Sequence, residues 1–112
     1  MVMSNPFNNE PCFVISIAAR MVGLHAQTLR YYERVGLVDP SRTMGRRRVY
    51  SPQEIERLRR IKTLTEGMGV NLAGVEIVLK LMDRINTLET TIDRLTKQVN
   101  HIQATQSKKQ QQ

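Results

Sequence analysis

The apolar residues near the front of the chain follow short segments that are separated by glycine. Residues 13–15 form a β-prone lead-in, and Ser16 is then placed to cap a helix over residues 17–22. A serine hydroxyl there accepts a hydrogen bond from a free N–H group of the first helical turn. Gly23 predicts the end of this helix.

A second helical segment begins at His25 or Ala26 and runs to about Val35, and Gly36 suits the left-handed position after a helix. Two short helices joined by a tight, glycine-containing turn indicate a helix-turn-helix. In that arrangement the second helix enters the major groove of DNA.

Residues 38–50 have β-type ends around Pro40 and Gly45, which predicts a short hairpin with about five central residues. Its tip carries four arginines, Arg42, Arg46, Arg47 and Arg48. A solvated charged loop is the ordinary explanation for such a run. Four guanidinium groups on one small hairpin repel one another, so a wing that binds phosphates or the minor groove is the preferred interpretation.

The next segments carry clear helix starts. Ser51, Pro52 and Glu54 stand at the N-cap, N1 and N3 positions of a capping box. The apolar residues at helical spacing behind them are Ile55, Leu58, Ile61, Leu64 and Met68. Gly67 and Gly69 predict the end of this helix, and Asn71 is placed to cap another over residues 72–82.

From residue 85 the apolar positions follow a strict heptad. Its members are Ile85, Leu88, Ile92, Leu95, Val99 and Ile102. β-Branched residues at the a positions with mostly leucine at d favour a two-stranded coiled coil, so we expect a homodimer.

These elements predict a mainly α fold, a winged helix-turn-helix with a C-terminal dimerising coiled-coil helix. The expected parts are a flexible N-terminal arm over 1–12, a DNA-binding domain over 13–82, a coiled coil over 83–104 and a disordered tail over 105–112.

The charge of the chain supports a polyanionic partner. The net charge is +7, and residues 1–62 hold eleven basic and five acidic residues, against six and five in residues 63–112. Charge alone does not separate DNA from RNA or an anionic membrane. Tyr31, Tyr32 and Tyr50 could stack on RNA, but the helices and the wing fit duplex DNA better.

Other classes of site have little support. Cys12 is the single cysteine, and its spacing to His25 and His101 matches no metal-ligand set. There is no nucleophile–base pair and no phosphate-binding glycine loop, so we expect no enzyme and no cofactor. No signal peptide or membrane span is visible, and a reducing, cytoplasmic location at the nucleoid is expected.

The order of elements resembles the MerR family of bacterial transcription regulators. Residues 28–34 with Gly36 and Leu37 are similar to its recognition-helix signature. Residues 47–51 are similar to the segment that leads from its wing into the third helix. The resemblance covers about residues 14–81. It implies DNA contact by Arg30 and at least one tyrosine hydroxyl.

Within that family, residues 14–19, 24–30 and 69–75 resemble the heat-shock repressor branch. The resemblance implies repression of chaperone operons through inverted repeats, with an Hsp70-type chaperone as co-repressor in some members. A nitrogen-metabolism branch has a similar stretch and stays an alternative. The cysteines of metal-sensing relatives and the effector domain of drug-sensing relatives have no counterpart here, and Gln27 stands where the family often has arginine.

The expected contacts with DNA are of two kinds. Gln27 can pair with adenine, worth about 1–3 kcal/mol of discrimination, or it can be an exposed residue near a phosphate. Arg30 can bind phosphate, or it can pair with Glu33 or Glu54; one of the adjacent tyrosines is expected to lie partly in the core. The expected DNA-binding residues are Arg20, His25, Ala26, Gln27, Thr28, Arg30, Tyr31, Tyr32, Arg42, Arg46, Arg47, Arg48 and Tyr50.

Two functions of other classes also fit these features. An architectural, excisionase-like protein would bend DNA with little role in transcription. An adaptor would use the coiled coil to recruit a partner protein.

Overall fold

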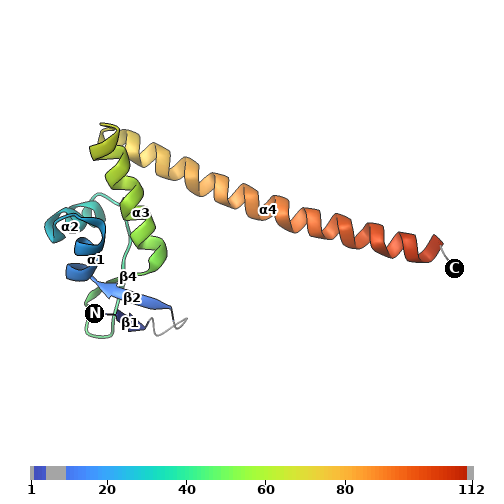
Figure 1. Ribbon diagram of the computed structural model, residues 1–112, viewed down its shortest axis with the longest axis horizontal. Coiled ribbons are helices and arrows are strands. Elements are labelled where there is room, and N and C mark those ends of the chain that lie inside the picture. The colour runs from blue at the N-terminus through green and yellow to red at the C-terminus, as the bar shows by residue number, and fades with distance from the viewer. Residues whose placement is uncertain (1, 5–9, 111–112) are drawn as a thin grey trace. The chain divides into compact units, whose positions relative to one another are not determined.

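The computed structural model of the protein describes residues 2–4 and 10–110, and Figure 1 shows its helices and strands. The elements in chain order are β1 (Val2–Ser4), β2 (Pro11–Val14), α1 (Ile15–Val22), α2 (Ala26–Arg34), β3 (Ser41–Arg42), β4 (Arg48–Tyr50), α3 (Pro52–Lys62), the π-helical turn η1 (Thr63–Gly67) and α4 (Leu72–Gln110). They divide into one unit that ends at Glu76 and a second that begins at Ile77.

Helix α1 begins earlier than the sequence predicts. Its N-cap is Val14, which makes no side-chain capping bond, and Ser16 lies exposed inside the first turn. The prediction of Ser16 as the cap was wrong because Val14 is already fixed in an extended conformation by its pairing with Val49 of β4. The strand therefore leads directly into the helix.

Both short helices end at the predicted glycines. Gly23 and Gly36 have φ angles of 71° and 84°, a region that glycine adopts without steric cost. After α2, the N–H of Leu37 donates to the carbonyl of Tyr32 at 2.9 Å and the N–H of Gly36 donates to Glu33 at 3.1 Å. This is the bonding of a Schellman motif, so the predicted C-terminal ends are confirmed.

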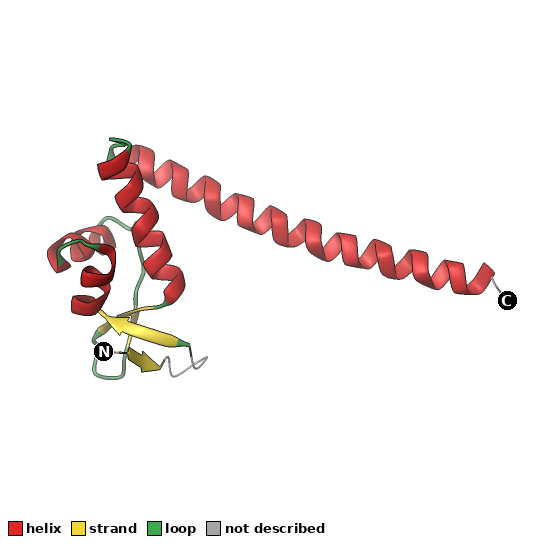
Figure 2. Cartoon of the chain, viewed as in Figure 1, coloured by secondary structure: helices red, strands yellow, loops and turns green. Residues whose placement is uncertain are grey.

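The strands form one antiparallel sheet in the order β1-β2-β4-β3. Figure 2 shows them together at one end of the three short helices. The expected hairpin is formed by β3 and β4, which are joined by residues 43–47. The flexible arm expected over residues 1–12 is wrong for residues 2–4 and 11–12, because β1 and β2 pair there; residues 5–9 lie outside the described residues.

Helix α3 begins as predicted at Ser51, whose hydroxyl accepts from the N–H of Glu54 at 3.2 Å. The Glu54 carboxyl was expected to accept a hydrogen bond from the backbone N–H of Ser51. It accepts one from the backbone N–H of Asp39 instead. Burial raises the pKa of Glu54, and the nearby Asp39 carboxylate raises it further. Glu54 therefore joins the segment before the wing to the start of α3.

The core of the first unit lies where α1 packs on α2, α3 and the sheet. Its fully buried side chains include Leu29 of α2 and Leu58 and Ile61 of α3. Burial of each such side chain stabilises the fold by about 1.5–3 kcal/mol. The other buried apolar residues are Cys12, Ala18, Ala19, Val22, Tyr32, Leu37, Val38, Val49, Tyr50, Ile55 and Val75.

Helix α4 is longer than predicted. Asn71 caps it as expected, since its Oδ1 accepts from the N–H of Gly74 at 2.9 Å. The helix was expected to end near residue 82 and the tail to be disordered from 105, but it continues without a break to Gln110. Residues 111–112 lie outside the described residues. None of the described helices combines the length and apolar character needed to cross a lipid bilayer.

Candidate nucleic-acid interface

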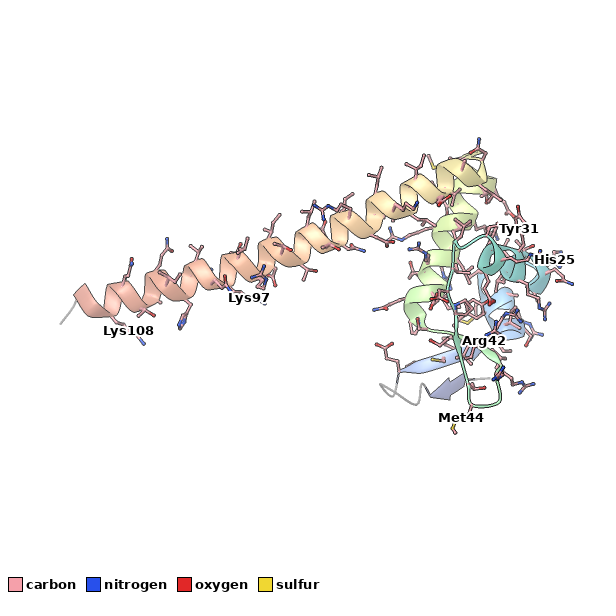
Figure 3. All side chains as sticks on the ribbon, turned by 180° about the vertical axis from the view of Figure 1, so that it is seen from behind. His25, Tyr31, Arg42, Met44, Lys97 and Lys108 are labelled. Atoms are coloured by element: carbon pink, nitrogen blue, oxygen red, sulfur yellow. The ribbon has the colours of Figure 1, made fainter. Side chains whose placement is uncertain are left out.

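Helix α2 has one exposed face and one buried face. Gln27, Tyr31 and Arg34 lie at i, i+4 and i+7, the spacing of one helical face, and all three are exposed. Leu29 and Tyr32 face the core. In Figure 3, His25 and Tyr31 point outward along the outer side of this helix. The polar side chains of the recognition helix are therefore accessible to a ligand.

The remaining predicted residues of this region differ in exposure. Arg20 of α1 and His25 are exposed, whereas Ala26, Thr28 and Arg30 are half-buried. Tyr32 is 6% exposed and Tyr31 is 40% exposed, so one of the adjacent tyrosines lies in the core, as predicted. The Arg34 guanidinium lies 5.7 Å from the centre of the Tyr31 ring, within cation–π range.

The wing ends in a tight turn within residues 43–47. The N–H of Arg46 donates to the carbonyl of Thr43 at 2.8 Å, and the N–H of Thr43 donates to Arg47 at 3.0 Å. Arg46 has a φ angle of 62° and is the one non-glycine residue in the left-handed region among the described residues. Met44 is 99% exposed and lies at the tip in Figure 3. The turn thus projects one apolar side chain and two arginines, Arg46 and Arg47, into solvent.

The base of the wing is held to α2 by an acidic residue that sequence reasoning assigned differently. Arg42 Nη2 donates to Glu33 Oε1 at 2.7 Å, and Arg48 Nε donates to Glu33 Oε2. From the sequence, Glu33 was considered as a partner for Arg30, and all four wing arginines were predicted to bind a polyanion. Glu33 is the one acidic residue between positions 11 and 38. Its isolation among arginines is the signal in the sequence from which these ion pairs could have been predicted.

Tyr50 lies in the core and not on the interface. Its side chain is fully buried, and its hydroxyl has no hydrogen-bond partner within the described part of the chain. Burial, followed by the nearby Glu33 carboxylate, raises the pKa of Tyr50 to about 12. In this structure Tyr50 therefore has no exposed atom that could make the predicted contact with DNA.

The second unit is a single helix with an exposed apolar stripe. The six predicted heptad residues, Ile85, Leu88, Ile92, Leu95, Val99 and Ile102, are 44–62% exposed. Leu81, at the preceding d position, is 58% exposed, so the stripe begins four residues earlier than predicted. Such a stripe on an isolated helix exposes apolar surface to water, a geometry typical of helices that pair.

Among residues 2–4 and 10–110, no group of three or more histidine, cysteine, aspartate and glutamate side chains is placed to hold a metal ion.

Comparison with known proteins places the chain in a family. The model for MerR HTH family regulatory proteins matches residues 13–81. A Streptomyces coelicolor protein named for heat shock, HspR, is 46% identical over 88 residues, which are 76% of this chain and 58% of that protein. This chain thus spans little more than half the length of that relative. The regulator GlnR of Bacillus anthracis is 36% identical over 98 residues, 88% of this chain and 74% of GlnR.

Solved structures share the fold. HiNmlR, a MerR family regulator that lacks the sensor domain and was crystallised bound to promoter DNA, aligns with a TM-score of 0.57 at 18% identity. The alignment covers 82% of this chain and 76% of HiNmlR. A MerR family regulator from Bacillus cereus aligns with a TM-score of 0.55 at 23% identity, over 81% of this chain and 77% of that one. The family match over the helix-turn-helix, the wing and the start of α4 shows that this chain belongs to the MerR HTH family of regulatory proteins.

Proposed function

We propose that the protein is a sequence-specific, double-stranded DNA-binding repressor of heat-shock and chaperone genes that binds inverted repeats as a homodimer. The observation that carries this proposal is the juxtaposition of the exposed polar face of α2 with a basic wing fixed to the same helix through Glu33. A helix of this kind enters the major groove, and basic side chains beside it contact phosphates.

The residues divide into base readers and backbone binders. Gln27 lies at the second position of α2 and is exposed, where its amide can pair with the N6 and N7 atoms of adenine. Arg46 and Arg47 at the wing tip have the reach and charge for phosphates or the minor groove. Arg30 and the Tyr31 hydroxyl are assigned to phosphates, and Arg20 of α1 is a further candidate.

Dimerisation is assigned to the stripe of α4, which a second copy would cover. Two recognition helices joined in this way match a palindromic operator with two half-sites. The similarity to HspR supports a heat-shock regulon, and an Hsp70-type chaperone is the proposed co-repressor. The protein acts as a regulator and not as an enzyme, at the nucleoid in the cytoplasm.

A second regulon has specific support. The match to GlnR extends over 98 residues and a larger share of that relative than the match to HspR does. A role in nitrogen metabolism is therefore the second candidate, with the same DNA-binding mechanism.

Selection of bound duplexes from a random pool, followed by footprinting, tests the proposal. We expect enrichment of one inverted repeat and protection of two symmetric halves. Protection without sequence preference, together with strong bending, would favour an architectural protein. Absence of duplex binding at physiological salt would reject DNA recognition altogether. Occurrence of the selected repeat before chaperone genes or before nitrogen genes separates the two regulons.

A further inference from the structure

Glu33 contacts both strands of the wing from the recognition helix. One carboxylate oxygen accepts from Arg42 on β3, the other accepts from Arg48 on β4, and these two arginines are register partners across the hairpin. Arg42 also donates through Nη1 to the carbonyl of Arg46 at 3.4 Å. A single side chain of α2 thus holds the wing at its base and, through Arg42, near its tip.

These bonds differ in geometry from a single surface ion pair, because both oxygens of one carboxylate are occupied. The Glu33 side chain is 21% exposed, and those of Arg48 and Arg42 are 29% and 43% exposed. Charge-assisted bonds that occupy both oxygens of a partly buried carboxylate restrict geometry more than a loose pair in solvent. The wing should therefore keep one pose relative to α2.

The carboxylate also changes which wing arginines can bind DNA. Carboxylate and phosphate oxygens present similar acceptors to a guanidinium, so Glu33 occupies two groups that would otherwise bind any phosphate. Arg46 and Arg47 form no ion pair with any residue in the described ranges 2–4 and 10–110. Without Glu33 the hairpin would carry four competing phosphate ligands in place of two.

We propose that Glu33 is a positioning residue for sequence specificity. It fixes the wing beside the recognition helix and withholds Arg42 and Arg48 from non-specific phosphate binding. This inference rests on the proposed function, in which α2 and the wing read duplex DNA together.

The substitution Glu33→Gln tests it, because glutamine keeps the shape and removes the charge. The control is Glu56→Gln on α3, which makes the same change in net charge at an exposed residue outside the wing and α2. Both variants are titrated with the selected operator duplex and with a shuffled duplex over a range of salt concentrations.

For Glu33→Gln we expect tighter binding to the shuffled duplex and a salt slope steeper by roughly one to two units, as released arginines take up phosphates. The ratio of specific to non-specific affinity should fall about tenfold or more. Glu56→Gln should shift both affinities alike and leave the ratio unchanged. A Glu33→Gln ratio equal to that of Glu56→Gln would overturn the proposal.

A second measurement needs no DNA. Backbone ¹⁵N relaxation of residues 43–47 should show greater fast motion in Glu33→Gln than in the wild type or Glu56→Gln, and equal motion would overturn the positioning role. If the wild type bound no duplex, the proposed function would be rejected. The relaxation measurement would still show whether Glu33 holds the wing in place. If Glu33→Gln did not fold, Glu33→Asp would replace it. Specificity and wing motion equal to those of the wild type would then contradict the proposal.

Discussion

The Nζ atom of Lys62 donates a hydrogen bond to the backbone carbonyl of Val22 at 3.1 Å, although forty positions separate the two residues. A second bond reaches the carbonyl of Gly23 at 3.3 Å. The ammonium group at the end of α3 therefore satisfies carbonyls that the end of α1 leaves without partners, where the helix dipole also favours a cation. This contact fixes the turn of the helix-turn-helix.

Loss of that ammonium should destabilise the fold. Lys62→Met keeps much of the apolar stem, and we expect it to lower the free energy of unfolding by about 1–2 kcal/mol. The control, Lys97→Met, removes a lysine that is 76% exposed and pairs with Asp93 at 3.0 Å, and should cost about 0–0.5 kcal/mol. Urea denaturation measures both. Equal losses would mean that the Lys62 contact contributes no more than a surface pair.

The buried Tyr50 hydroxyl predicts an alkaline loss of stability. Its pKa is raised from 10.0 to about 12, chiefly by burial, so the folded state holds this proton more tightly than the unfolded chain. Its contribution is complete below pH 10 and is lost as the pH rises through about 12. Between pH 10 and about 12, the free energy of unfolding should fall by about 2 kcal/mol less in Tyr50→Phe than in the wild type.

At neutral pH, Tyr50→Phe should be as stable as the wild type or slightly more stable, because the hydroxyl it removes has no partner in the described part of the chain. Its affinity for duplex DNA should be unchanged. A marked loss of duplex affinity in a folded variant would restore Tyr50 to the interface. Urea denaturation at neutral and alkaline pH, with a duplex titration, makes the test.

The left-handed conformation of Arg46 predicts a difference between two substitutions that remove the same charge. Arg46→Gly relieves the backbone and Arg46→Ala does not, so the glycine variant should be more stable by about 1 kcal/mol. Both should bind duplex DNA more weakly than the wild type. Thermal unfolding and duplex titration measure the two effects separately, and equal stabilities would show that Arg46 is unstrained.

The apolar stripe of α4 predicts dimerisation. Leu95 is 46% exposed at a central d position, and Leu95→Asp should shift the protein toward monomer and weaken operator binding. Thr90→Asp places the same charge at an exposed f position and should leave the assembly unchanged. Analytical ultracentrifugation distinguishes them. A wild type that is monomeric at micromolar concentration would refute the pairing.

The division between base readers and phosphate binders predicts two different defects. Gln27→Ala should relax sequence choice by about 1–3 kcal/mol while leaving the salt slope unchanged. Arg47→Ala should weaken binding to all duplexes and flatten the slope by about one unit. Titration of matched and mismatched duplexes at several salt concentrations separates the two, and exchanged phenotypes would reverse the assignments.

Local signals account for the parts of the fold that the sequence predicts well. Gly23 and Gly36 end their helices through bonds within a few residues, and Ser51 and Asn71 begin theirs in the same way. The heptad of α4 likewise follows from short-range spacing. These features depend on residues close in sequence, so pattern alone can place them.

The predictions that failed depend on distant partners or on competing propensities. The strand β1 exists through pairing with β2, and Glu33 meets Arg48 because the wing folds back on α2. The polar composition of residues 105–110 indicates disorder, yet lysine and glutamine are also good helix formers, and α4 continues through them. Composition alone could not decide between these outcomes.

Cys12 adds a consequence for how two copies associate. The thiol is 1% exposed, and burial raises its pKa, which disfavours the thiolate that attacks oxidants and disulfides. It is the single cysteine of the chain, and its burial disfavours a disulfide between two copies. Association would then be a reversible equilibrium governed by concentration, and the complex should come apart on dilution and not on addition of dithiothreitol.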